Sequence, residues 1–348
     1  MINENSSDNY IPTEKINRQS IVMLVGGTDP TGGAGLAADI ATCRLVQGYP
    51  MPVVSCVTSQ DSKGFRRMQA VDLDIFRDQI ESVLNDVVPD AIKIGMLPSA
   101  KHMRILAELL CLHEHGPVVF DPVMAPTAGA DNFTSDWWED RSTLMLFLSQ
   151  VDLITPNAVE LERLASPVRE DPAFKQQLEN VSYPDNASED EIRLMQLITD
   201  MHILRISYGL DRILLTGGHN PGLRLHSDFL LEPRPDLECP PEIMEQSEDG
   251  EPPVAYSVAH IAGEKIDTPN THGTGCVYST AIACLLAKGA PYHVAVKMAK
   301  ELIGFLLKAG KDWRLYEEGH GPAYSILAMP DDDGGRMSLT QGLSEYLN

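Results

Sequence analysis

The stretch Thr268-Pro-Asn-Thr-His-Gly-Thr-Gly-Cys276 precedes an apolar run, Val277 to Ala287, that has helical spacing and no helix breaker. The run predicts a buried helix, and the glycines before it allow a tight turn that aims successive N–H groups at one point. The helix N-terminus adds partial positive charge, which suits a phosphate or a developing oxyanion. We expect Cys276, in the first turn, to have a lowered thiol pKa and to act as an acid/base group. The alternative is a glycine-rich turn into a core helix, with Cys276 as one more small buried residue.

A second glycine-rich segment, 26–35, reads GGTDPTGGAG and lies between a predicted strand at 21–25 and a predicted helix at 36–47. This order places a ligand at the carboxyl end of the strand. The segment matches neither Gly-x-Gly-x-x-Gly nor the Walker A motif, which argues against a dinucleotide-binding dehydrogenase and a P-loop site. Asp39 falls one turn inside the helix, where it either reaches back to the loop or is an exposed helix acid.

Strands and helices alternate along the rest of the chain. Short apolar runs predict strands at 52–58, 91–97, 117–124, 151–157 and 212–219, and helical spacing predicts helices at 75–87, 103–113, 144–149 and 297–308. Such alternation is typical of an α/β fold with a parallel sheet covered by helices on both faces. Polar and acidic residues gather at the carboxyl ends of the strands, where such sheets bind ligands.

Composition excludes several classes of function. The chain has 348 residues and a formal net charge of -23, which argues against binding to nucleic acid or to an anionic membrane. The 6 cysteines are scattered without a Cys-x-x-Cys motif, as expected for reduced thiols rather than disulfides or a zinc site. We find no apolar signal region and no run long enough to span a bilayer, so we expect a soluble, cytoplasmic protein.

No linker separates two cores, and we expect one domain over residues 20–325. Residues 1–19 are predicted to be a disordered leader, and residues 326–348 a C-terminal tail. Two polar, acid-rich segments that contain prolines interrupt the alternation, near 166–191 and 232–253. We expect them to be surface insertions.

Six motifs together resemble the hydroxymethylpyrimidine/phosphomethylpyrimidine kinases of thiamine biosynthesis, a branch of the ribokinase-like superfamily. The four principal blocks and two supporting ones lie at 26–39, 93–97, 121–124, 270–276, 154–160 and 217–219. The resemblance extends over about residues 21–321. It implies a three-layer α/β/α fold with a central, mostly parallel sheet, and a homodimer.

The implied activity is two successive phosphoryl transfers from ATP with Mg²⁺. The first acceptor is the hydroxymethyl oxygen of 4-amino-5-hydroxymethyl-2-methylpyrimidine, and the second is the resulting monophosphate. Phosphoryl transfer depends on positioning and charge neutralisation more than on covalent chemistry. Two rival readings remain: a pyridoxal or pyridoxine kinase of the same superfamily, and a pyrimidine-binding protein with little catalytic activity.

The resemblance also implies roles for individual residues. The pyrimidine pocket would be lined by Gly27, Ala34, Asp39, Gln60, Met96 and Val123. The transferring phosphoryl group would be held by Gly273, Thr274, Gly275 and Cys276, with Cys276 also taking or orienting the hydroxyl proton. ATP would contact Asn157, Thr216, Gly218 and Thr271, and the metal would be held by Glu160 and Asp121.

Three of these assignments have plainer alternatives, and one position departs from the family. Met96 and Val123 could be ordinary core residues, and Glu160 could serve only the N-terminus of its helix. Thr216 stands where the family usually has a lysine that reaches the nucleotide phosphates. A hydroxyl carries no charge, so the binding of ATP is expected to differ here.

Overall fold

The computed structural model describes residues 19–124, 137–179, 183–184, 186–217, 227–234, 254–317 and 319–323. In chain order the elements are β1 (Ile21–Thr28), α1 (Gly35–Leu45), β2 (Tyr49–Asp61), β3 (Gly64–Ala70), α2 (Leu73–Leu84), β4 (Ala91–Ile94), α3 (Ala100–Leu112), β5 (Val118–Phe120), α4 (Arg141–Leu148), β6 (Leu153–Ile154), α5 (Ala158–Arg169), α6 (Pro172–Glu179), α7 (Glu189–Tyr208), β7 (Ile213–Leu215), β8 (Asp228–Arg234), β9 (Ala255–Ile261), α9 (Thr274–Ala287) and α10 (Tyr292–Gly310).

The strands of the described residues form one sheet in the order β3-β2-β1-β4-β5-β6-β7-β8-β9. Strands β2, β1, β4, β5, β6 and β7 pair in parallel, whereas β3, β8 and β9 add antiparallel pairs at the two edges. The mostly parallel sheet predicted from the alternation of elements is therefore confirmed. Its parallel strands end at one edge, which is where the glycine-rich loops lie.

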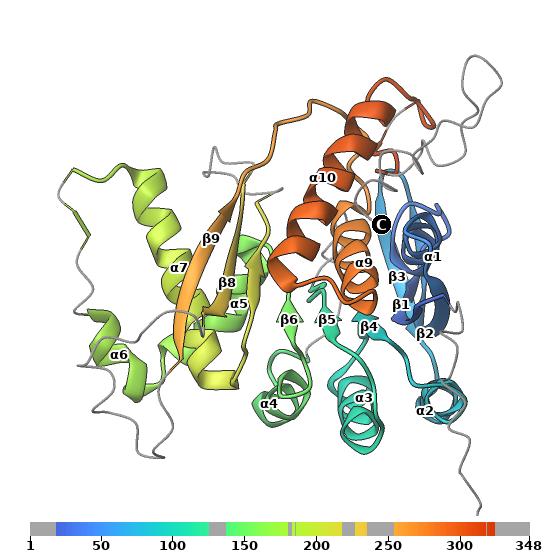
Figure 1. Cartoon of the computed structure of the whole chain (residues 1–348), viewed down its shortest axis with the longest axis horizontal. Helices are drawn as coiled ribbons and strands as arrows, with labels where there is room; N and C mark the ends of the chain where they lie inside the picture. Colours follow the sequence, from blue (N-terminus) through green and yellow to red (C-terminus); the bar gives the residue numbers. More distant parts are fainter. Residues whose placement is uncertain are drawn as a thin grey trace, which may run out of the picture.

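Two apolar cores cover the two faces of the sheet, as the three-layer prediction requires. One core joins the sheet to α2, α3, α4, α5 and α7, through residues such as Phe76, Phe147 and Leu204. The other joins it to α1, α9 and α10, and Figure 1 shows α9 and α10 lying side by side. Helix α9 is buried along most of its length because its side chains are small or apolar on every face. That packing fixes the position of its N-terminus.

The structure differs from the sequence-based expectations in two respects. The acidic segment near 166–191 contains the end of α5, all of α6 and the start of α7, and Val168 in it is fully buried. The prolines there suggested a loop, but α5 contains Pro167 and α6 begins at Pro172. Strands β3, β8 and β9 were missed, because antiparallel strands at and beside the sheet edges need no long apolar run. The leader at 1–18, Gly218, most of the segment at 232–253 and the tail beyond 323 lie outside the described residues.

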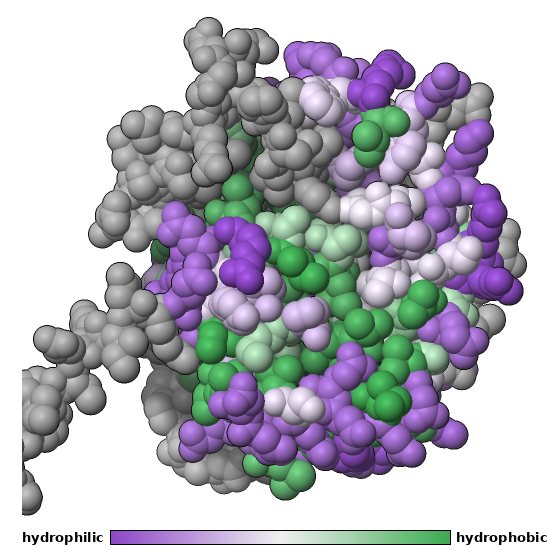
Figure 2. All heavy atoms as spheres, turned by 90° about the vertical axis from the view of Figure 1, so that its right-hand side faces the viewer, coloured by the Kyte–Doolittle hydropathy of each residue, from purple (hydrophilic) through white to green (hydrophobic). Residues whose placement is uncertain are grey.

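The edge formed by β2 and β3 exposes apolar side chains. Val57 and Tyr49, both on β2, are 53% and 44% exposed. Figure 2 looks at this side of the molecule and shows hydrophobic residues gathered in its middle, with hydrophilic residues around them. Across the described part of the chain, no helix combines the length and the hydrophobicity that a bilayer crossing requires.

Candidate active site

A cavity of about 370 Å³ opens where the glycine-rich loops meet the carboxyl ends of the parallel strands. Every described residue that the sequence assigned to the site lines this cavity; they are Gly27, Ala34, Asp39, Gln60, Met96, Asp121, Val123, Asn157, Glu160, Thr216, Thr271, Gly273, Thr274, Gly275 and Cys276. Gly218 lies outside the described residues. Motifs up to about 250 residues apart in the chain thus form one site.

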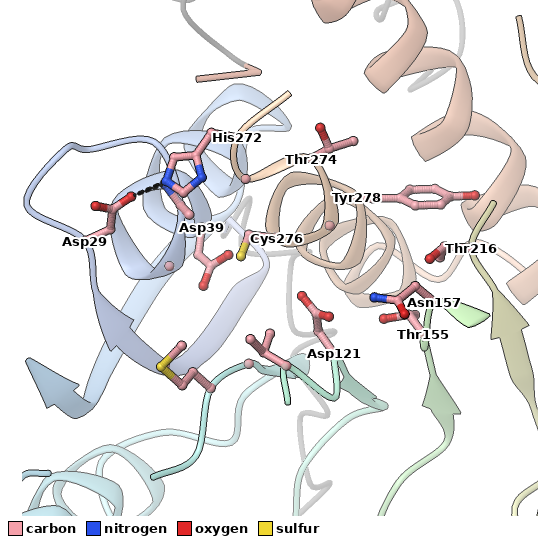
Figure 3. A pocket seen from close by; sticks show the side chains of 18 of the residues that line it. Asp29, Asp39, Asp121, Thr155, Asn157, Thr216, His272, Thr274, Cys276 and Tyr278 are labelled. Atoms are coloured by element: carbon pink, nitrogen blue, oxygen red, sulfur yellow. Dashed lines mark hydrogen bonds and ion pairs between the residues drawn. The ribbon is translucent and has the colours of Figure 1, made fainter. Parts of the chain in front are cut away.

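The cavity has two ends with Cys276 between them. Figure 3 shows Asp29 and His272 on one side of Cys276, and Thr216 and Asn157 on the other. Cys276 points into the space between, and Asp121 lies below it in the same view. This arrangement can hold two ligands end to end, with their contact point beside the N-terminus of α9.

The two glycine-rich loops pack backbone against backbone. Gly273 has a φ of 78°, and a Cβ placed on it would lie 1.9 Å from the carbonyl oxygen of Gly33. Only glycine satisfies both the positive φ and this contact. The sequence around Gly273 therefore fixes how close the start of α9 comes to the loop before α1.

Asp29 and His272 connect the same two loops. The Asp29 carboxylate accepts hydrogen bonds from the backbone N–H groups of Thr31 and Ala34, each at 2.8 Å, and lies 2.8 Å from His272 Nε2. Burial alone would raise the pKa of Asp29, but the hydrogen bonds from His272 and Thr31 lower it to about 2. Neither Asp29 nor His272 was assigned a role from sequence, although both stand inside the quoted motifs. Their spatial proximity could not be read from positions 243 residues apart.

Sulfur atoms form the wall at one end of the cavity. A Cβ on Gly27 would meet Cys56 Sγ at 2.8 Å and Met96 Sδ at 3.4 Å. The Ser55 hydroxyl donates to the carbonyl of Met96 at 2.6 Å, which fixes the backbone there. Met96 and Val123 are both partly exposed to the cavity rather than enclosed in the core. The alternative of plain core packing for these two residues does not hold.

Asp39 is fully buried and forms an ion pair with Lys93. The Lys93 ammonium lies 2.9 and 3.0 Å from the two carboxylate oxygens, and the Thr280 hydroxyl donates to the same carboxylate at 2.8 Å. Burial alone would lower the pKa of Lys93, but the neighbouring Asp39 carboxylate raises it above its usual value. The alternative of an exposed helix acid is therefore wrong. Lys93 was quoted in a motif without a role, and its partner could not be identified from the sequence.

The Cys276 thiol does not have the lowered pKa that its position in the helix predicted. Burial raises its pKa to about 12, and the Asp39 and Asp121 carboxylates add to this effect. Lys93 and a hydrogen bond from the Gly35 N–H act in the other direction but are outweighed. The helix N-terminus is a weaker influence than burial among carboxylates, so this group is a protonated thiol at neutral pH.

The first turn of α9 presents backbone donors to the cavity. The Thr274 N–H donates to the carbonyl of Thr271, and the Thr274 hydroxyl donates to the same oxygen at 2.6 Å. The N–H groups of Gly275 and Cys276 follow in the same turn, where a helix leaves its donors without intrahelical acceptors. The Thr274 N–H is thus already engaged, whereas those of Gly275 and Cys276 can hold an anion.

Asp121 and Glu160 bring two carboxylates to the same part of the cavity. Burial, and then repulsion from Asp121, raises the pKa of Glu160 to about 8. Burial likewise raises the pKa of Asp121. Glu160 also accepts from the Asn157 N–H at 2.9 Å, while the Asn157 side chain accepts from the Glu160 N–H, so the two form a capping box. The helix-capping alternative for Glu160 is therefore confirmed, and it leaves the electrostatic preference for a cation in place.

The other end of the cavity is built around Asp228, which sequence reasoning missed. Its carboxylate accepts from the Gly217 N–H at 2.9 Å, the Tyr278 hydroxyl at 2.9 Å and Lys300 at 2.8 Å. Thr216, next to Gly217, forms a bridge with Asn157. The three donors come from three separate elements, and no motif connected them.

Comparison with known proteins finds a matching family model and several relatives of this chain. The family model of phosphomethylpyrimidine kinases matches residues 29–250 and 254–323. A thiamine biosynthesis multifunctional protein of Corynebacterium efficiens is 31% identical over 304 residues, which make up 87% of this chain and 35% of that protein. A hydroxymethylpyrimidine/phosphomethylpyrimidine kinase of Staphylococcus aureus is 28% identical over 84% of this chain and 89% of that protein. The chain spans about a third to a half of the length of the multifunctional relatives that it matches.

Solved structures agree on the fold. A pyridoxal kinase of Bacillus subtilis in complex with ADP has a TM-score of 0.65 at 25% identity, and the match covers 89% of this chain and 99% of that chain. A phosphomethylpyrimidine kinase of Clostridium difficile has a TM-score of 0.53 at 22% identity, and the match covers 81% and 98% of the two chains. The ribokinase-like fold expected from the motifs is confirmed.

Proposed function

Because the chain belongs to the phosphomethylpyrimidine kinase family, we propose that it phosphorylates 4-amino-5-hydroxymethyl-2-methylpyrimidine and then the resulting monophosphate, using ATP in both steps. One observation carries the proposal. The N-terminus of α9, with Cys276, lies between two ends of a single cavity, where a phosphoryl donor and an acceptor would meet. The activity supplies the precursor of thiamine diphosphate.

The acceptor occupies the end of the cavity formed by Gly27, Gln60 and Met96. The absent side chain at Gly27 leaves room beside the two sulfur atoms, which suits the face of a flat ring. The Gln60 amide can both donate to and accept from the edge of an aminopyrimidine. Asp39 acts indirectly, because its carboxylate already accepts from Lys93 and Thr280.

The transfer itself needs an aligned hydroxyl and an anion site. The hydroxymethyl oxygen forms a bond to the γ-phosphorus as the bond from that phosphorus to the bridging oxygen breaks and ADP leaves. The Gly275 and Cys276 N–H groups hold the oxygens of the moving phosphoryl group. Since the Cys276 thiol is protonated in the free protein, we assign it to orienting the hydroxyl, and the hydroxyl proton passes to an oxygen of the transferred phosphoryl group.

Asp121 and Glu160 fit a magnesium ion. Both are oxygen donors in a partly enclosed site, and burial raises the pKa of each carboxyl, so a bound cation would favour their ionised forms. Within the described segments no group of three or more histidine, cysteine or acidic residues is arranged to bind a metal. That finding agrees with Mg²⁺, which binds through one or two carboxylates together with substrate phosphates and water, and supplies charge neutralisation.

The experiment that tests the proposal is an assay of ADP formation with Mg-ATP. It compares hydroxymethylpyrimidine, its monophosphate, pyridoxal and no acceptor. We expect turnover with both pyrimidines above the rate without acceptor. Turnover with neither pyrimidine, in a protein that binds them tightly, would instead indicate a pyrimidine-binding protein.

A second candidate is a pyridoxal kinase, and the match to the B. subtilis enzyme favours it. The two activities share the same donor and the same chemistry, and differ in the ring held near Gly27, Gln60 and Met96. A preference for pyridoxal in the same assay would establish this alternative.

We also propose that the protein is a cytoplasmic homodimer. The five described cysteines, Cys43, Cys56, Cys111, Cys276 and Cys284, are all free thiols, which supports a reducing compartment. The exposed apolar side chains on β2 support association through that edge of the sheet.

A further inference from the structure

The carboxylate of Asp228 joins three elements at the end of the cavity away from Gly27. Asp228 is the first residue of β8 and is 1% exposed. One of its oxygens accepts from the Gly217 N–H, and the other accepts from Tyr278 on α9 and from Lys300 on α10. A buried carboxylate with these partners holds Lys300 in one position.

Lys300 is the lysine of this cavity that a ligand can reach. Of the described lining residues, the lysines are Lys93 and Lys300. The Lys93 side chain is 1% exposed, and its ammonium contacts both oxygens of Asp39. The Lys300 side chain is 20% exposed, and its ammonium forms an ion pair with one oxygen of Asp228. Because an ammonium has three donors, Lys300 can still donate to a second anion.

Lys300 lies at the end of the cavity around Asp228, which the phosphoryl donor would occupy and which we call the donor end. Tyr278, which shares an oxygen of Asp228 with Lys300, lies two residues after Cys276 on α9. Gly217, bound to the other oxygen, directly follows Thr216. Figure 3 places Tyr278 and Thr216 on the same side of Cys276, away from Asp29 and His272. A phosphate chain that leads away from Cys276 would pass this group.

A positively charged side chain such as Lys300 would offset the negative charge of a nucleotide bound in this cavity. Asp121 and Asp228 bring buried carboxylates to this part of the cavity, and a nucleoside triphosphate adds several negative charges. We propose that Lys300, positioned by Asp228, binds the phosphate chain of the nucleotide and sets its affinity. This inference rests on the proposed use of ATP. The competing explanation is that Lys300 only neutralises Asp228 and contacts no ligand.

The test measures binding to the full chain by calorimetry, with Mg-ATP, adenosine and hydroxymethylpyrimidine as separate ligands and competition titrations where binding is weak. In Lys300→Met we expect affinity for Mg-ATP to fall about tenfold to a hundredfold, as for a lost hydrogen bond between charged groups. Affinity for adenosine and for the pyrimidine should change less than about twofold. The matched control is Lys297→Met, on an exposed face of the same helix and outside the cavity, which should bind all three ligands as the wild type does.

Two further variants separate contact with phosphate from support of the fold. Lys300→Met leaves Asp228 buried without its cation, so the double variant Lys300→Met/Asp228→Asn removes both charges and keeps the site neutral. It should show the same selective loss of Mg-ATP binding. Tyr278→Phe removes a donor to Asp228 but no charge, and should weaken Mg-ATP binding much less than Lys300→Met does.

Unchanged Mg-ATP affinity in both Lys300 variants would overturn the inference. So would an equal loss for Mg-ATP and adenosine, or an equal loss in Tyr278→Phe, because these patterns mark a residue that only supports the fold. If the wild-type chain itself fails to bind Mg-ATP, the proposed function fails with it. Normal ATP binding by the wild type together with normal binding by Lys300→Met refutes the role of Lys300 alone.

Discussion

Cys276 shows how one residue can keep its place in the site and lose the property expected of it. The motif placed it correctly in the first turn of α9, between the two ends of the cavity. Its thiol pKa is nevertheless raised to about 12, because burial disfavours the thiolate and the Asp39 and Asp121 carboxylates, which come from other parts of the chain, add to this effect. Helix position is a local property that can be read from sequence. The surrounding charges are a tertiary property that cannot.

We predict that Cys276→Ala lowers kcat by about a hundredfold or more, since a positioned acid/base or orienting group contributes on this scale. Binding of the pyrimidine should be largely unchanged, because the acceptor end is formed by other residues. Steady-state kinetics and pyrimidine titrations check both expectations. Weaker pyrimidine binding with near-normal turnover would show that Cys276 belongs to the acceptor pocket instead.

Asp29 allows a prediction about pH. Its pKa is lowered from 3.8 to about 2, which corresponds to about 2 kcal/mol of stability through its bonds to His272 and Thr31. Because the pKa of Asp29 is lower in the folded than in the unfolded protein, ionised Asp29 stabilises the fold fully at a pH above its unfolded-state pKa of 3.8. This stabilisation is lost as the pH falls through the folded-state pKa of about 2. Asp29→Asn should therefore lower the free energy of unfolding by about 2 kcal/mol near neutral pH, and by about half as much near pH 3.

Urea denaturation of the wild type and Asp29→Asn across this pH range measures the difference. Each protein must remain folded at the start of each titration. A difference that stays constant from neutral pH to about pH 3 would show that the ionised carboxylate is not what stabilises these loops.

Thr216 is partly exposed in the cavity, adjacent to the residue that binds Asp228. A lysine there would add a cation to the donor end, and we predict that Thr216→Lys tightens Mg-ATP binding by about tenfold. Thr216→Val is the control, and should leave the affinity within about threefold because it removes only a neutral hydroxyl. Calorimetry measures the affinity of each variant for Mg-ATP. An unchanged affinity in Thr216→Lys would mean that this position does not face the phosphates.

At the scale of elements, the close packing of the two glycine loops can be tested by substitution. Gly273 and Gly289 both have a positive φ, of 78° and 85°. A Cβ on Gly273 would strike the carbonyl of Gly33 at 1.9 Å, whereas a Cβ on Gly289 meets nothing within 4 Å. The pair therefore separates backbone strain from steric contact.

We predict that Gly289→Ala destabilises the fold by about 1–2 kcal/mol, the cost of the left-handed conformation alone. Gly273→Ala carries the same cost and must also push the loops apart, so it should destabilise more and lower kcat by moving the start of α9. Thermal unfolding and kinetics of both variants give the comparison. Equal effects on stability, with normal kcat in each, would show that the contact between the loops is not needed.

The elements themselves were predictable where the chain has a single strong signal. The run Ile21–Val25 is fully apolar and lies within β1, and the apolar run of α9 gave that helix almost to its ends. β9 was missed because its side chains are only partly buried, so its sequence lacks a strong pattern. Helix α5 was masked by Pro167 and by the acidic residues around it. Its stability comes from burial of Leu161 and Leu164, which is a tertiary effect.

The site was predictable as a set of positions but not as a set of interactions. Motifs identified which loops meet, because parallel strands place their carboxyl ends together. The pairs that set the electrostatics, Asp39 with Lys93 and Asp228 with Lys300, join residues 54 and 72 positions apart. A lysine on α10 carries no local mark that distinguishes it from Lys297, three residues earlier and exposed. Only the packing of α10 against α9 and β8 brings it to the cavity.

At the scale of the whole molecule, the strong negative charge favours apolar rather than charged contacts between two copies of the chain. A net charge of -23 makes two copies repel at long range, and salt screens that repulsion. On the side of β2 and β3, Val57 and Tyr49 are exposed, and Figure 2 shows hydrophobic residues gathered on this side of the molecule. Burial of such side chains is the favourable term that can outweigh the repulsion.

We therefore predict that the wild type sediments as a dimer and that Val57→Asp sediments as a monomer, because a carboxylate buried in the interface would be desolvated and repelled. The matched control is Ile206→Asp on α7, which is 58% exposed against 53% for Val57 and lies on the opposite side of the molecule in Figure 1. It should remain a dimer. Analytical ultracentrifugation at low and high salt distinguishes the cases, and the dimer should strengthen with salt as the repulsion is screened. A Val57→Asp protein that is still dimeric would place the interface elsewhere, and a monomeric wild type at high salt would refute the dimer itself.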